Sequence, residues 1–116
     1  MDKEPIIMRL DRKDFDRIKE GKQLWELRLN DLKRKNIRSG DTIVFMRRPE
    51  LEDRLVVTVL ERQHFNDIQR LLDKIPMTEL RGEQMDELEF IQSFMAHYRP
   101  DEVVQHGIVA FKIQKQ

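Results

Sequence analysis

Cysteine is absent from this chain of 116 residues, and its apolar residues form no long uninterrupted run. Without cysteine there is no disulfide scaffold, no thiolate zinc site and no cysteine nucleophile. No window approaches the roughly 20 apolar residues of a membrane-spanning helix, and the first residues carry no signal-peptide pattern. We therefore expect a cytoplasmic protein that makes no use of a membrane.

Several catalytic sequence patterns are missing as well. The three histidines, His64, His97 and His106, show no HExxH spacing, so we predict no metal site and no cofactor. Ser39 and Ser93 lie outside any GxSxG sequence, and neither a P-loop nor a GxGxxG motif occurs. The serine-hydrolase elbow and the common nucleotide fingerprints are therefore excluded.

Charge is abundant but unevenly distributed. The net charge is zero, yet residues 1–48 hold 14 Lys/Arg against 9 Asp/Glu, whereas residues 49–116 hold 8 against 13. This asymmetry predicts either a basic surface that faces an anionic partner or two halves that neutralise each other across the fold. The length and the absence of a linker predict one domain over residues 1–116.

Hydrophobic periodicity predicts a mixed fold. Strands are expected over 6–10, 24–30, 42–47, 54–62 and 107–113, with an antiparallel hairpin between the third and the fourth. Helices are expected over 11–21, 31–35, about 65–75 and 84–98, the last of them ended by Pro100. This order predicts an α+β fold with a small curved sheet or barrel flanked by helices.

The segment 21–28, GKQLWELR, holds the candidate site. Strand alternation places Trp25, Leu27 and Leu29 on one face, which we expect in the core. The other face carries Glu26, Arg28 and Asn30, with Lys22 at its start. A carboxylate between cations stays ionised, so it could serve as a general base or accept the amine of a nucleobase. The alternative is an ordinary ion pair on a solvated strand face.

The order of these residues resembles the ASCH domain, a family with a PUA-like β-barrel fold. The matching residues are Ile18, Gly21, Lys22, Glu26, Arg28, Leu29, Asn30 and Asp31, followed by Ile37, Gly40, Asp41, Ile43 and Phe45. The likeness covers about residues 6–113. It implies a small curved barrel of about five to six mostly antiparallel strands, flanked by three to four helices.

The resemblance also implies contact with RNA or a nucleotide, and the first hypothesis is a binding module with a basic cleft. The candidate ligand-binding residues are Lys22, Glu26, Arg28, Asn30, Lys33, Arg34, Lys35 and Tyr98. The sequence names no protein partner.

The second hypothesis is a hydrolase, because some similar proteins hydrolyse N4-acetylcytidine or cleave RNA with a metal. Glu26 would then be the acid and base, and Lys22 or Arg28 would stabilise the developing charge. The family signature GxKxxExR has Gln23 at its lysine position, which argues against amide hydrolysis unless Lys22 substitutes. A third hypothesis, docking of a protein on the acidic segment 79–89, competes with a simple solvated helix surface.

Overall fold

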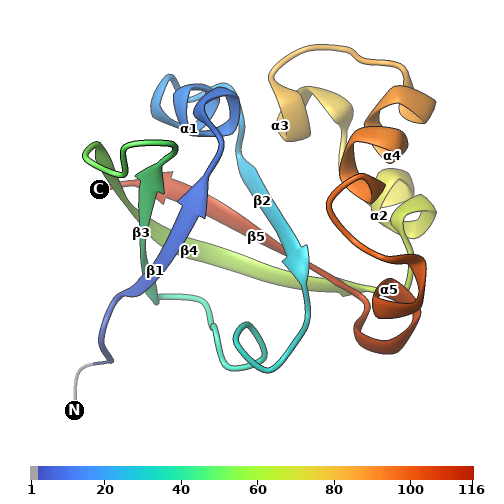
Figure 1. The fold of residues 1–116 in the computed structure, drawn as a ribbon, viewed down its shortest axis with the longest axis horizontal. Helices are drawn as coiled ribbons and strands as arrows, with labels where there is room; N and C mark the ends of the chain where they lie inside the picture. Colours follow the sequence, from blue (N-terminus) through green and yellow to red (C-terminus); the bar gives the residue numbers. More distant parts are fainter. Residues whose placement is uncertain (1–2) are drawn as a thin grey trace.

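The computed structural model describes residues 3–116, which form five strands and five helices (Figure 1). The strands are β1 (Ile6–Leu10), β2 (Trp25–Leu29), β3 (Thr42–Arg47), β4 (Arg54–Phe65) and β5 (Ile108–Lys115). The helices are α1 (Arg12–Lys19), α2 (Ile68–Lys74), α3 (Met77–Arg81), α4 (Glu87–Met95) and α5 (Pro100–His106). No helix within these residues has the length and apolarity needed to cross a bilayer.

The five strands form one curled sheet in the order β1-β3-β4-β5-β2. β1 and β3 are parallel, and every other pair is antiparallel, including the predicted hairpin of β3 and β4. β4 carries an irregularity between Val59 and Glu61, which helps this long strand to bend. The result is a half-barrel that stays open between β1 and β2, and it confirms the expected α+β curved-barrel class with one helix more than expected.

Two cores stabilise the arrangement. The first fills the inside of the half-barrel, where Phe15 and Ile18 of α1 pack at one end and Ile37 packs with the same cluster. The second lies between the outer face of β2 and β5 and the helices α2 to α5, which gather on that side (Figure 1). Trp25 and Leu29 belong to this outer core, so strand alternation turns Glu26 and Arg28 toward the inside.

The predicted helix over 31–35 is wrong, because this segment forms turns. The carbonyl oxygen of Asp31 accepts from the backbone nitrogens of Arg34 and Lys35, so a single helix-like turn forms but does not continue. The guanidinium of Arg62 on β4 donates to the carbonyl oxygens of Arg34 and Ile37, at 3.0 and 3.2 Å. Contacts with another strand therefore outweigh the local preference for a helix.

The predicted helix over 84–98 is shorter in the structure and is followed by a second helix. Asp86 begins α4, because its carboxylate accepts a hydrogen bond from the backbone nitrogen of Glu89 at 3.3 Å. Pro100 does not simply end a helix; it is the first residue of α5, a position for which its fixed φ is well suited. The short helix α3 was not predicted, and β4 continues to Phe65 rather than ending at residue 62.

Candidate functional site

A cleft of about 940 Å³ opens between α1, β2 and the end of α4. Its lining holds seven arginine or lysine residues and four carboxylates, so positive charge is in excess. The charged lining residues are Arg9, Arg12, Lys13, Arg17, Arg28, Arg48 and Arg81, with Asp11, Asp14, Glu26 and Glu83.

A buried ion pair from β2 lies at this cleft. Nε of Arg28 donates to Oε2 of Glu26 at 2.8 Å, and the two side chains are only 16% and 7% exposed. Nη2 of Arg28 also donates to the carbonyl oxygen of Arg9 on β1, at 2.8 Å. Nη1 of Arg28 has no acceptor within residues 3–116 and is available to a ligand.

Burial sets the protonation behaviour of the pair. Loss of water raises the pKa of the Glu26 carboxyl above its ordinary value, the charge of Arg28 counteracts this, and the nearby carboxylate of Asp14 raises the pKa again. Burial alone would lower the pKa of Arg28, but the adjacent Glu26, together with Tyr98 and Asp14, outweighs burial, and the pKa is raised. The cleft therefore contains a carboxyl group that takes up a proton more readily than an exposed glutamate.

A second chain of polar contacts continues from α1. Nε of Arg17 donates to Oε1 of Gln23 at 3.0 Å, and Nη2 of Arg17 donates to Asp14 at 2.7 Å. Asp14 also lies 3.7 Å from the guanidinium of Arg81 on α3. Gln23 is buried and donates its own amide hydrogen to the carbonyl oxygen of Trp25. The residue at the lysine position of the signature is thus a satisfied buried amide, with the charge of Arg17 beside it.

Aromatic rings form another side of the cleft. Tyr98 follows α4, and its ring lies 4.9 Å from that of Phe94 at 41°. Burial raises the pKa of Tyr98, so its hydroxyl stays protonated. Trp25 is buried, as expected, and its ring nitrogen donates to Glu79 at 3.0 Å. Tyr98 rather than Trp25 is therefore the aromatic ring that a ligand can reach.

The structure brings only three of the predicted site residues together, namely Glu26, Arg28 and Tyr98. Lys22 is exposed, pairs with Glu20 at 3.1 Å and does not line the cleft. Asn30 accepts a hydrogen bond from Arg62 at 2.6 Å and lies outside it too. The remaining three, Lys33, Arg34 and Lys35, lie in the turns of 31–36, on a separate surface.

Sequence reasoning missed three cleft residues that the contacts single out. Asp14 and Arg17 are three residues apart on α1, a spacing that places side chains together on a helix and was a usable signal. Arg81 carried no such signal, because only the tertiary fold brings α3 to α1. No group of three or more His, Asp or Glu side chains in residues 3–116 is placed to hold a metal ion.

The chain matches one protein family and is similar to solved structures, among them the following two. The sequence profile of the ASCH domain family matches residues 8–115. The crystal structure of hypothetical protein PH0355 superposes with a TM-score of 0.86 and 25% identity, covering 97% of this chain and 100% of that one. The solution NMR structure of protein PF0455 from Pyrococcus furiosus superposes with a TM-score of 0.74 and 25% identity, covering 97% of each chain. No curated protein matches the sequence.

Proposed function

The chain belongs to the ASCH domain family, and from this premise we propose that its cleft binds RNA, or a nucleotide unit of it, in the cytoplasm. The observation that carries the proposal is the buried Glu26–Arg28 pair in a cleft whose lining is predominantly basic. Because the two side chains are already held in place on the strand, little conformational entropy is lost when a ligand binds to them, which favours tight and selective contacts.

Each part of the cleft has a role in this proposal. Arg12 and Lys13, both exposed at the start of α1, attract the phosphate backbone. Nη1 of Arg28 donates to a phosphate or base oxygen, and Tyr98 offers a ring on which a base can stack. The buried Glu26–Arg28 pair contacts the polar edge of a base, and a base whose polar groups do not match the pair would leave them without hydrogen bonds.

The test is RNA affinity measured by fluorescence anisotropy at about 50 mM salt, where phosphate contacts are strongest. We expect the charge reversal Arg12→Glu/Lys13→Glu to weaken binding at least tenfold, because it replaces two positive charges of the cleft with negative ones. Neither side chain makes a hydrogen bond or ion pair within residues 3–116, so the fold should be unaffected. The matched control is Lys19→Glu/Lys74→Glu, which makes the same charge change on exposed residues outside the cleft. Equal affinities for the two variants, or no binding by the unaltered protein, would refute the proposal.

One observation favours a second function, hydrolysis of a modified nucleoside or of RNA. Burial raises the pKa of Glu26, and a carboxyl group with a raised pKa is better suited to give and take a proton than an exposed glutamate is. Lys22 lies outside the cleft, so Arg17 or Arg28 would have to stabilise the developing charge. Incubation with N4-acetylcytidine and with RNA, each with and without divalent metal, tests this function. Product that disappears in Glu26→Gln supports it, and intact substrate rules it out.

A further inference from the structure

A second basic surface surrounds the turns of 31–41, and none of its residues lines the cleft. We call it the loop patch, made of Lys3, Lys33, Arg34, Lys35, Arg38 and Arg62. Two of its cations are neutralised, Arg34 by Asp31 and Lys3 by Asp41, each at 2.9 Å. The other four make no ion pair with any residue in 3–116, and the nearby carboxylate of Glu61 accepts from Gln63 instead.

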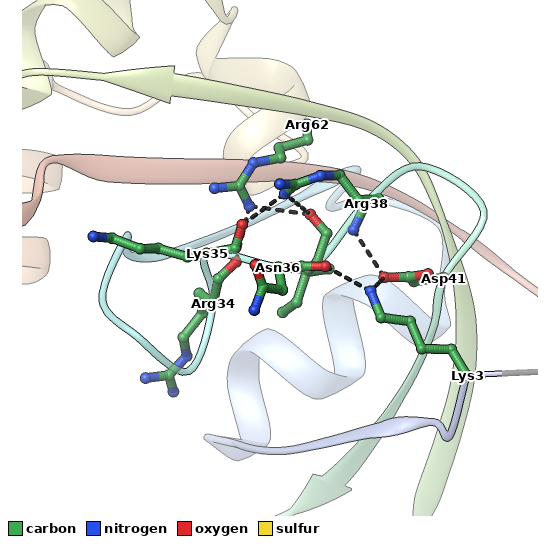
Figure 2. A network of polar contacts seen from close by, with 8 residues as sticks. Lys3, Arg34, Lys35, Asn36, Arg38, Asp41 and Arg62 are labelled. Atoms are coloured by element: carbon green, nitrogen blue, oxygen red, sulfur yellow. Dashed lines mark hydrogen bonds and ion pairs between the residues drawn. The ribbon is translucent and has the colours of Figure 1, made fainter.

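Two guanidinium groups of the loop patch lie against the same oxygen atom. Nη1 of Arg38 and Nη1 of Arg62 both donate to the carbonyl oxygen of Ile37, at 3.3 and 3.2 Å (Figure 2). Nη1 of Arg38 also donates to the carbonyl oxygen of Lys35, and Nη2 of Arg62 donates to Asn30, both at 2.6 Å. Neutral oxygens therefore hold two positive charges side by side.

The two guanidinium charges repel each other, and the carboxylate of Asp41, whose pKa the charge of Arg38 lowers, is already paired with Lys3. Burial lowers the pKa of Arg62, and the charge of Arg38 lowers it further. The hydrogen bonds from Arg38 and Arg62 hold the turn in place, but a neutral donor could satisfy the same carbonyl oxygens. Holding the turn therefore does not explain why both donors are positively charged. An anion between the two guanidinium groups would relieve the repulsion.

Arg38 also has the donors that such an anion needs. Its side-chain hydrogen bonds both leave from Nη1, so its Nε and Nη2 have no acceptor in the part of the chain that the structure describes. These two N–H groups form the parallel fork that fits two oxygens of a phosphate. The side chain of Lys35 extends outward, with its ammonium group away from the other residues drawn (Figure 2).

We propose that the loop patch is a second anion site, which binds a phosphate group between Arg38 and Arg62 with Lys33 and Lys35 at its rim. The site is separate from the cleft and does not depend on the function proposed there. The phosphate belongs either to a nucleic-acid backbone or to a small phosphorylated compound, since both present the same pair of oxygens.

The experiment is an NMR titration of the backbone amides at about 50 mM salt, with inorganic pyrophosphate in one arm and single-stranded RNA in the other. We expect saturable shifts at residues 33–39 and 61–63. Arg38→Gln removes the pair of parallel N–H donors, so the dissociation constant obtained from these shifts should rise at least tenfold. Because Arg38 also holds the turn, Lys33→Glu/Lys35→Glu serves as a second variant whose exposed side chains hold nothing in place. The control is Lys19→Glu/Lys74→Glu, which should bind as the unaltered protein does.

The two arms separate the sources of the phosphate. Shifts with both probes, or with RNA alone, assign the site to a nucleic-acid backbone, whereas shifts with pyrophosphate alone assign it to a small ligand. Loop shifts without cleft shifts would support the loop patch while contradicting the proposed cleft function. The loop-patch proposal is wrong if neither probe shifts these amides, or if the rim variant and the control bind equally well.

Discussion

Glu26 and Arg28 place two charges in the interior of a small protein, and each stabilises the other there. The remaining ion pairs of the described structure are more exposed, such as Arg99 with Asp101, whose side chains are 75% and 67% exposed. Exposed pairs contribute about 0–1 kcal/mol, whereas removing one member of a buried pair leaves an uncompensated charge. The signature residues of the cleft are therefore also structural residues.

Arg28→Gln should consequently lower the free energy of unfolding by about 3 kcal/mol or more, because Glu26 loses its partner in a site with little water. Arg99→Gln, the control, should lower it by less than about 1 kcal/mol. Urea denaturation monitored by the fluorescence of the buried Trp25 measures both. A loss for Arg28→Gln as small as that of the control would show that the pair is effectively solvated.

Glu26 should also give stability a distinctive pH dependence. Its pKa is raised above the ordinary value of 4.5, so the folded protein holds this proton more tightly than the unfolded chain does. The contribution to stability is therefore fully present below pH 4.5 and is lost as the pH rises through the folded pKa. We expect the stability of the unaltered protein relative to Glu26→Gln to fall as the pH rises above 4.5. Unfolding curves at several pH values measure this difference, and a constant difference would contradict the assigned shift.

Among the elements, the junction of α5 and β5 allows little substitution. Gly107 has φ 73° and ψ −177°, a conformation that only glycine adopts readily, and an added Cβ would collide with the ring of His64. Gly40 has φ 93° but open space around it.

Gly107→Ala should therefore destabilise the fold by about 1–3 kcal/mol more than Gly40→Ala, since it adds a steric overlap to the backbone strain. Thermal unfolding of the two variants gives the comparison. Equal melting temperatures would mean that β4 moves aside at no cost.

The residues that precede helices α1 and α2 differ in how they cap them. The carboxylate of Asp67 accepts a hydrogen bond from the backbone nitrogen of Arg70 at 2.9 Å, whereas Asp11, which precedes α1, makes no side-chain cap. Asp67→Ala should cost about 1 kcal/mol of unfolding free energy, and Asp11→Ala only a few tenths. Urea denaturation distinguishes the two, and the reverse order would contradict the assigned caps.

The sequence predicted what local patterns determine. Alternation along β2 placed Trp25 in the core and turned Glu26 and Arg28 to the other face, and the order of strands and helices indicated the curved α+β fold. Prediction from the sequence failed where contacts with residues distant in the chain determine the structure. The turns of 31–36 are held by Arg62 from β4. The series of polar contacts that links Gln23 to Arg81 depends on how α1 and α3 pack against each other.

At the scale of the whole molecule, a net charge of zero conceals two basic surfaces, the cleft and the loop patch. RNA affinity should fall linearly with salt on logarithmic axes, with a slope of about 0.7 per phosphate contact for single strands. Arg12→Glu/Lys13→Glu should flatten that slope, because it removes phosphate contacts, and Lys19→Glu/Lys74→Glu should not. Anisotropy titrations at several salt concentrations measure both slopes, and identical slopes would show that the cleft cations do not meet phosphate.

The half-barrel is open between β1 and β2, and the hydrogen bond from Arg28 to the carbonyl oxygen of Arg9 crosses that opening. The guanidinium of Arg28 thus joins the two edge strands of the open half-barrel, and the same group lines the cleft. A ligand that accepts from Nη1 leaves this hydrogen bond in place, so we expect an occupied cleft to hold the two free strand edges together more firmly.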